Sequence, residues 1–179
     1  MYSLVFLFFF ELKNNMVYIA LGSNQGNRFE LLQEAVYRIR KRIGTVLSVS
    51  KVYESPAWGF ESESFLNACI KIKTERVAHE VLEILLAIEN ELGRDQTPKE
   101  GYAARPIDLD ILLFDEQIIS EKRLEIPHPR MELRQFVLTP LLDIAAEVTH
   151  PISTKTIQNL QESCKDESVL RVWAEPLKF

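Results

Sequence analysis

Two aspartates at alternate positions of an apolar segment carry the clearest chemical signal in the sequence. Asp108 and Asp110 lie in the run 107–114, whose alternation and length predict a β-strand. Side chains two apart in a strand share a face, so the carboxylates would stand side by side. Unpaired neighbouring carboxylates are costly to bury, and Mg²⁺ removes that cost while also binding substrate phosphate. The pair predicts a metal site for phosphoryl chemistry, with two solvated acids as the alternative. The opposite, core-facing set would be Ile107, Leu109, Ile111 and Leu113.

A loop with several cations precedes this strand. Residues 94–106 contain Arg94, Lys99 and Arg105, together with prolines and a glycine that break helices. Cations on a flexible loop beside two acids suggest a phosphate clamp that closes over metal-bound nucleotide. A solvated linker is the ordinary role of a charged loop. The adjacent aspartates favour the clamp.

Two titratable residues lie outside this region. Glu89 is on the apolar face of an expected helix, 77–92, near its C-terminus, where an acid is locally unfavourable. A metal-bound water or a clamp cation would compensate for that charge; a partly exposed edge residue is the alternative. His128 lies between two prolines that fix the direction of its ring, with Arg130 and Arg134 nearby. A phosphate contact and a purely structural histidine are both open.

The elements that must position these residues follow the order β-α-β-β-α-β. Expected strands are 17–21, 46–53, 65–73 and 107–114, and expected helices are 28–43 and 77–92, followed by helices at 139–146 and 155–164. This order is typical of the α+β ferredoxin-like fold, an antiparallel sheet with both helices of the repeat on one face. The other face would then be left open.

The third expected strand shows what stands on that open face. Phe65 and Asn67 share it, whereas the alternate residues Leu66, Ala68, Ile70 and Ile72 would face the core. An aromatic ring beside an amide could stack on a flat heterocycle and hydrogen-bond its edge. A surface phenylalanine under another loop is the alternative.

Composition limits the class of protein. The 179 residues suit one domain, and 46% hydrophobic content allows a substantial core. A net charge of −5 argues against nucleic acid as the main partner. The two cysteines and three histidines have no metal-ligand spacing. The sparse cysteines favour a reducing, cytoplasmic compartment.

The first fifteen residues differ from the rest. Residues 4–10 are wholly apolar but far shorter than the roughly 20 residues of a membrane span, and they lack the features of a signal peptide. We expect residues 1–15 to be an upstream extension that is not part of the fold, and residues 16–179 to form a single domain. A short membrane-seeking anchor is the alternative for the extension.

In their order and spacing, several short motifs together resemble the 6-hydroxymethyl-7,8-dihydropterin pyrophosphokinases of folate biosynthesis. They are residues 18–24 (YIALGSN), 53–56 (YESP), 65–67 (FLN), 107–111 (IDLDI) and 126–131 (IPHPRM), and the resemblance extends over about 17–150. The family implies a ferredoxin-like fold, ATP and two Mg²⁺ ions. It also implies transfer of the β,γ-pyrophosphoryl unit to the pterin hydroxymethyl group, with release of AMP.

The resemblance also implies roles for particular residues. Asp108 and Asp110 are similar to the Mg²⁺ ligands, and with Arg94 and Arg105 they make up the implied catalytic set. The implied pterin contacts are Ser55, Trp58, Phe65, Asn67 and Phe136, and the implied ATP contacts are Glu89, Arg105, Ile111, His128 and Arg134. The loop departs from the commonest family pattern at Gln96 and over 99–105, which affects Lys99 and Tyr102.

Two other functions compete with this one. A nucleotidyltransferase also combines Gly-Ser with Asp-x-Asp, but only one short helix separates them there, whereas most of a domain separates Ser23 from Asp108. A non-catalytic ferredoxin-like module that binds a small ligand would not need both the acids and the cationic loop. The favoured function predicts ATP and the hydroxymethyl-dihydropterin as substrates, a monomer, and no nucleic-acid or membrane partner.

Overall fold

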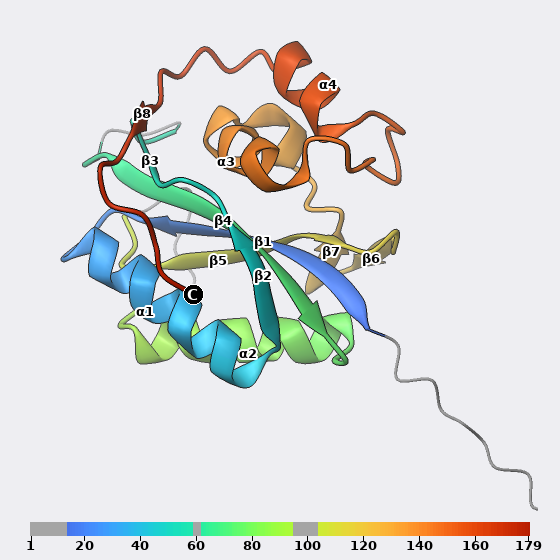
Figure 1. The fold of residues 1–179 in the computed structure, drawn as a ribbon, viewed down its shortest axis with the longest axis horizontal. Coiled ribbons are helices and arrows are strands. Elements are labelled where there is room, and N and C mark those ends of the chain that lie inside the picture. Colours follow the sequence, from blue (N-terminus) through green and yellow to red (C-terminus); the bar gives the residue numbers. More distant parts are fainter. Residues whose placement is uncertain (1–13, 59–61, 95–103) are drawn as a thin grey trace, which may run out of the picture.

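An antiparallel sheet lies between two pairs of helices (Figure 1). The computed structural model describes residues 14–58, 62–94 and 104–179. Its six-stranded sheet has the order β5-β1-β4-β3-β8, and β2 also pairs with β4. All of these pairings are antiparallel. The arrangement is the ferredoxin-like fold expected from the order of elements, with helices added after it.

The strands of the sheet are β1 (Asn15–Ser23), β2 (Thr45–Val49), β3 (Tyr53–Ser55), β4 (Phe65–Thr74), β5 (Asp108–Phe114) and β8 (Arg171–Val172). A separate hairpin consists of β6 (Ile119–Glu121) and β7 (Leu124–Ile126). The helices are α1 (Arg28–Arg42), α2 (Ala78–Glu91), α3 (Gln135–Ala145) and α4 (Ile157–Ser163), with a 3₁₀ turn at Met131–Leu133. Residues 1–13, which contain most of the expected extension, lie outside the described residues.

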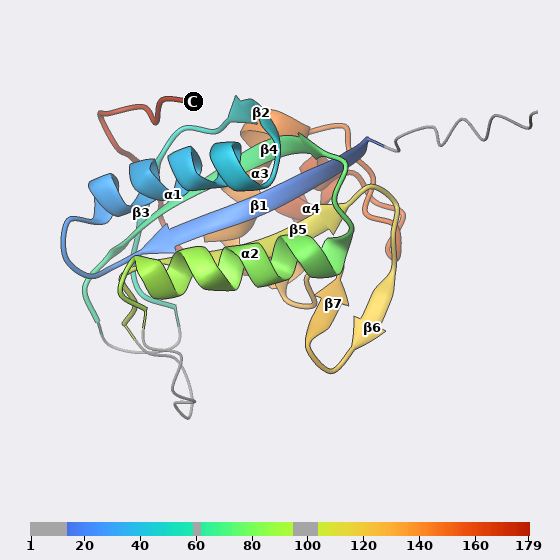
Figure 2. The same ribbon diagram turned by 90° about the horizontal axis from the view of Figure 1, so that it is seen from below.

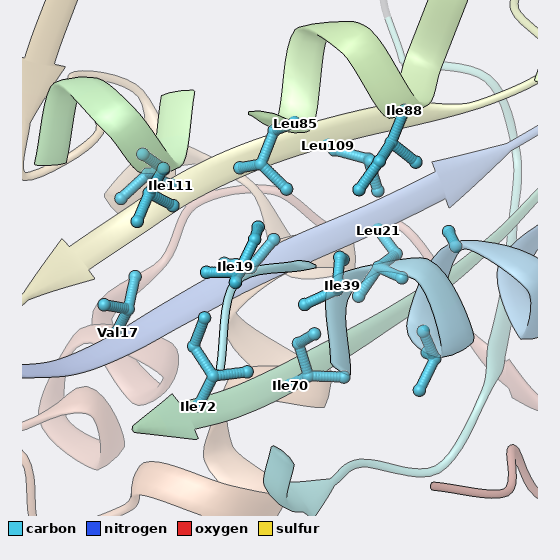
Figure 3. Packing of buried hydrophobic residues seen from close by; sticks show 14 of the residues in the cluster. Val17, Ile19, Leu21, Ile39, Ile70, Ile72, Leu85, Ile88, Leu109 and Ile111 are labelled. Carbon is cyan, nitrogen blue, oxygen red and sulfur yellow. The ribbon is translucent and has the colours of Figure 1, made fainter. Parts of the chain in front are cut away.

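The main core lies between the sheet and the pair α1 and α2, which run side by side across one face (Figure 2). Alternate residues of the strands supply its sheet side, because successive side chains of a strand point to opposite faces. Figure 3 shows Val17, Ile19, Leu21, Ile70, Ile72, Leu109 and Ile111 meeting Ile39 from α1 and Leu85 and Ile88 from α2. The core face expected for the third strand is therefore confirmed.

The second face of the sheet is not left open as expected. Helices α3 and α4 cover part of it and build a second cluster of buried residues (Figure 1). The sheet contributes Tyr18, Cys69, Leu112 and Leu113 to this cluster, and α3 contributes Val137, Leu138 and Leu141. The end of this face that carries Phe65, Asn67, Asp108 and Asp110 lines a cavity and is available for a site.

Leu113 faces this second cluster, not the main core, so its expected position was wrong. Between β1 and β5 the register shifts after Tyr18, which pairs with Leu113, whereas Ile19 pairs with Ile111. Leu112 is the extra residue of this β-bulge. Past the bulge the alternation of faces is reversed, so Phe114 reaches the main core instead.

Several boundaries also differ from expectation. The strand expected over 46–53 is divided into β2 and β3, which pair with successive parts of β4, and β3 ends just before Pro56. Helix α3 begins at Gln135, four residues before the expected start, and contains Pro140 in its interior. In the described part of the chain, no helix is both long and apolar enough to cross a membrane.

Candidate active site

A cavity of about 420 Å³ opens over the uncovered end of the sheet. Its floor comes from β1, β4 and β5, and its walls from the segment after β3 and from residues 128–137. Eleven of the predicted site residues line it: Ser55, Trp58, Phe65, Asn67, Arg94, Arg105, Asp108, Asp110, His128, Arg134 and Phe136. Residues from distant parts of the sequence thus meet in one hollow.

The two aspartates stand side by side on the cavity face of β5, as the alternation predicted. Their neighbours on β1 are Ala20, opposite Asp110, and Gly22, opposite Asp108. A Cβ atom built on Gly22 would lie 3.9 Å from Asp108 Cβ and 3.5 Å from Asn67 Oδ1. A larger side chain at this position would fill the floor between the acids and the amide.

Asp108 is paired with two arginines. Arg94 Nη1 lies 2.6 Å from Asp108 Oδ1, and Arg105 Nη1 lies 3.1 Å from each carboxylate oxygen. Arg94 also donates to the carboxylate of Glu89. Both guanidinium groups also line the cavity. They could therefore bind phosphate as well as Asp108.

Asp110 and His128 form a second titratable pair, with His128 Nε2 3.9 Å from Asp110 Oδ2. Burial and then the charge of Asp108 raise the pKa of Asp110 above its usual range. Burial, followed by the charges of Arg134 and Arg130, lowers the pKa of His128 to about 4. Its imidazole is therefore neutral at pH 7, and Nδ1 accepts from the Arg130 amide over 3.2 Å. This acceptor role places the ring proton on Nε2, which can donate into the cavity.

Aromatic rings and one amide line the rest of the cavity. Trp58 and Phe136 lie with ring centroids 6.5 Å apart, and Arg134 Cζ is 5.1 Å from the Trp58 centroid and 5.4 Å from that of Phe136. Asn67 is buried, and its Nδ2 donates to Ser55 Oγ over 2.9 Å. This hydrogen bond fixes the plane of the amide beside Phe65.

Glu89 and Ile111 do not line the cavity. The Ile111 side chain packs in the main core, so only its backbone could face a ligand. Glu89 has a side chain that is 2% exposed and accepts a hydrogen bond of 2.7 Å from the Leu109 amide. Glu89 thus lies outside the cavity lining and anchors Arg94 and the Leu109 amide. Lys99 and Tyr102 lie outside the described residues.

Asn24 is a residue of this region that the sequence reasoning did not single out. Its Oδ1 accepts from the Arg105 amide over 2.7 Å, while its Nδ2 donates to Ser62 Oγ over 3.0 Å. It thereby ties the segment that carries Arg105 to the segment that follows Trp58. The only signal in the sequence was its place in the Gly-Ser-Asn turn at the end of the first strand.

The donor set suits Mg²⁺ better than a metal held wholly by protein. Among residues 14–58, 62–94 and 104–179, no group of three or more His, Cys, Asp or Glu side chains could hold a metal ion. Mg²⁺ usually takes one or two carboxylates and completes its shell with water and phosphate. Two adjacent carboxylates at the wall of a cavity lined with arginines fit that requirement.

Comparisons with known proteins agree on one family. Its sequence model, described as 7,8-dihydro-6-hydroxymethylpterin-pyrophosphokinase (HPPK), matches residues 18–146. A relative from Porphyromonas gingivalis, named 2-amino-4-hydroxy-6-hydroxymethyldihydropteridine pyrophosphokinase, is 45% identical over 133 residues, covering 73% of this chain and 90% of the relative. A relative of the same name from Aquifex aeolicus is 39% identical over 163 residues, covering 90% of this chain and 98% of the relative.

The fold is also found in a longer protein. The crystal structure of wild-type HPPK-DHPS from Plasmodium falciparum aligns with a TM-score of 0.69 at 18% identity. The alignment covers 84% of this chain but 44% of that one, so this chain spans less than half of its length. At that identity the likeness concerns the fold alone.

Proposed function

Because this chain belongs to the 7,8-dihydro-6-hydroxymethylpterin-pyrophosphokinase family, we propose that the cavity over the end of the sheet binds both substrates side by side. The enzyme transfers pyrophosphate from ATP to 6-hydroxymethyl-7,8-dihydropterin and gives AMP and the pterin diphosphate, a step of folate biosynthesis. The observation that carries the proposed site is the meeting of two carboxylates, several arginines and an aromatic-amide wall in one hollow. A non-catalytic ligand-binding module is not favoured.

Asp108 and Asp110 are the proposed ligands of Mg²⁺, with two ions as the family resemblance implies. When bound, Mg²⁺ would neutralise negative charge on the phosphate chain and help to align it for transfer. The position of the pair supports this assignment, because both carboxylates line the cavity and a shared cation would stabilise their neighbouring charges. Glu89 supports the site from below by fixing Arg94 and the Leu109 amide.

Arg94, Arg105, His128 and Arg134 are the proposed contacts of the phosphate chain. The guanidinium groups of Arg94 and Arg105 are already within reach of Asp108, so ATP would meet them beside the acids. His128 is neutral at pH 7 and offers a proton on Nε2 to a phosphate oxygen. Phosphoryl transfer depends mainly on such positioning and on charge stabilisation.

The aromatic side of the same cavity is the proposed pterin pocket. Phe65 and Phe136 offer flat faces to the heterocycle, and Asn67 offers an amide whose plane is held by Ser55. Ser55 and Trp58 complete the wall with their backbone groups. The pterin hydroxyl would then attack the β-phosphorus of ATP, the bond from that phosphorus to the α,β-bridging oxygen would break, and AMP would leave.

We also propose that the chain forms one monomeric domain and that the enzyme works in the cytoplasm. The domain begins one residue earlier than expected, because Asn15 is buried and opens β1, and the extension is then limited to the residues before it. Cys69 and Cys164 are free thiols in the described structure, in keeping with a reducing compartment.

The reaction is tested by incubating the protein with ATP, Mg²⁺ and 6-hydroxymethyl-7,8-dihydropterin and separating the products. AMP should form in equal amount to the pterin diphosphate. Formation of ADP with a pterin monophosphate would contradict the proposed attack at the β-phosphorus.

A further inference from the structure

The last described segment of the chain, residues 171–178, forms a strap that closes over the edge of the sheet (Figure 1). Within it, β8 pairs with β3, so that Val172 lies opposite Tyr53 and Arg171 opposite Glu54. The amide of Trp173 then donates to the Val52 carbonyl over 2.8 Å. This strap lies beyond residues 18–146, the part of the chain that the family model matches.

The far end of the strap is also anchored. Leu177 is buried in the main core. The backbone of Lys178 and the side chain of Gln33 exchange two hydrogen bonds of 2.8 Å each. The indole of Trp173, between these two anchors, therefore has a defined place against α1.

Trp173 covers Arg28, whose Cζ lies 5.6 Å from the centroid of the indole ring. Arg28 Nη1 lies 3.0 Å from Glu54 Oε1, 2.8 Å from the Ser64 carbonyl and 2.8 Å from Ser64 Oγ. Ser64 Oγ in turn donates to Glu54 Oε1 over 2.7 Å. The guanidinium group of Arg28 thus links Glu54 to Ser64, the two residues that flank the segment 55–63.

The first residues of this segment form a wall of the cavity. Ser55, Pro56 and Trp58 belong to it and line the hollow, and Ser55 Oγ accepts the hydrogen bond that orients Asn67. No residue of the strap lines the cavity as described. An effect of the strap on the pterin would therefore pass through Arg28 and β3.

We propose that Trp173 is a positioning residue, which holds Arg28 across the ends of the segment 55–63 and so maintains the pterin-binding wall. The inference rests on the proposed placement of pterin against Ser55, Asn67 and Phe136. A tryptophan over a guanidinium group is favourable chiefly through the face of the ring, and covering the ion pair also shields it from water. The strap is thus expected to affect pterin binding more than ATP binding, because the segment reaches Arg105 only indirectly, through the hydrogen bonds of Asn24 to Ser62 and to the Arg105 amide.

The test is steady-state kinetics on the full chain with each substrate varied in turn. Trp173→Ala should raise KM for the pterin by about 2- to 30-fold, the range of a cation–π contact converted to a ratio, with a smaller change in KM for ATP. Trp173→Leu keeps apolar bulk but has no ring, so it should show the same selective change if Trp173→Ala folds poorly. Trp173→Phe should restore pterin binding, because the indole Nε1 has no hydrogen-bond partner among the described residues. Val172→Ala, at an exposed neighbour, is the matched control.

Two further variants separate the possible outcomes. If Trp173 acts through Arg28, then Arg28→Met and Trp173→Ala should be non-additive in their effects on KM for the pterin. Equal changes in both KM values, a normal KM for the pterin in Trp173→Leu, or additive effects would overturn the proposal. Asn67→Ala reports on the pocket itself: if it also binds pterin normally, the proposed placement of the pterin is wrong. If only Asn67→Ala is impaired, the strap inference alone fails.

Discussion

Glu89 Oε1 accepts a hydrogen bond of 2.7 Å from the backbone amide of Leu109, the residue between the two aspartates. A buried acid on α2 therefore holds the β5 backbone between the two proposed metal ligands. The same carboxylate receives the guanidinium group of Arg94, which also reaches Asp108. Glu89, which lies outside the cavity, thus contacts both the backbone between the two aspartates and the arginine that pairs with Asp108.

Ionisation of Glu89 should affect the free energy of unfolding. Burial raises the pKa of Glu89 to about 7, with Arg94 opposing the shift. The folded state therefore favours the protonated form of Glu89 more than the unfolded state does. This preference contributes fully to the free energy of unfolding below pH 4.5, and the contribution is lost as pH rises through about 7. Without Mg²⁺, the wild type should therefore lose stability relative to Glu89→Gln between pH 5 and pH 8. Urea unfolding of both proteins at each pH measures the difference.

The matched control for this experiment is Glu83→Gln, at an exposed glutamate on the same helix. It should keep the pH profile of the wild type. A difference between wild type and Glu89→Gln that stays constant from pH 5 to pH 8, or that changes in the opposite direction, would show that burial does not govern this carboxyl group.

Substitution of Asp108 or Asp110 should impair catalysis without preventing folding. Asp108→Asn and Asp110→Asn each remove a proposed Mg²⁺ ligand and should lower kcat by about 10²- to 10⁴-fold, since each decade is about 1.4 kcal/mol of barrier. Both side chains face the cavity, and asparagine at position 108 keeps an acceptor for Arg94 and Arg105, so both variants should stay folded. AMP production across a range of Mg²⁺ concentrations is the measurement, with the exposed Glu116→Gln as control. Near-normal turnover at limiting Mg²⁺ in either variant would exclude that residue as a ligand.

Arg105 tests the phosphate side of the site. Its Nη1 contacts both oxygens of Asp108, and its backbone amide is held by Asn24. Hydrogen bonds to charged groups contribute about 1.5–3 kcal/mol, so Arg105→Ala should reduce kcat/KM for ATP by roughly 10- to 150-fold. Arg123→Ala, at an exposed arginine on the β6–β7 connection, should not. Equal activity of the two variants would remove Arg105 from the proposed contacts.

The sequence predicted those parts of the fold in which alternation is regular. In β4, period two correctly separated the core residues from Phe65 and Asn67, and in β5 it placed Asp108 and Asp110 together. The same rule failed at Leu113, because a bulge at Leu112 reverses the faces and no residue type marks it. Strands of two or three residues, such as β8, are too short for any periodicity to be visible.

Contacts between segments that are distant in the sequence could not be predicted either. The cover provided by α3 and α4 could not be read from the motif order, because it depends on tertiary packing against Cys69 and Leu112. Glu89 was recognised as an unusual acid near the site, yet its partners could not be distinguished until the Leu109 amide and Arg94 were placed. Residue types thus indicated the chemistry, and the chain's three-dimensional path decided which groups meet.

Pterin selection should divide between the rings and the amide of the pocket. Phe65 and Phe136 offer faces to any flat heterocycle, so they should supply affinity with little discrimination. Asn67 offers its carbonyl acceptor and its remaining N–H donor in a plane fixed by the other N–H, which donates to Ser55, so it should supply discrimination. An unpaired buried polar group costs roughly 1–3 kcal/mol, so Asn67→Ala should weaken pterin binding about 5- to 150-fold. Calorimetric titration with the pterin measures this change.

Phe65→Ala tests whether the ring supplies affinity without discrimination. This variant should bind the pterin and its edge-modified analogues more weakly by a similar factor, whereas Asn67→Ala should reduce the preference among them. Titration with a non-hydrolysable ATP analogue should give near-normal affinity for both variants, because neither side chain belongs to the proposed phosphate wall. If Asn67→Ala kept normal pterin affinity, or lost affinity for the ATP analogue instead, then β4 would not form the pterin wall and the two substrates would have to exchange places in the cavity.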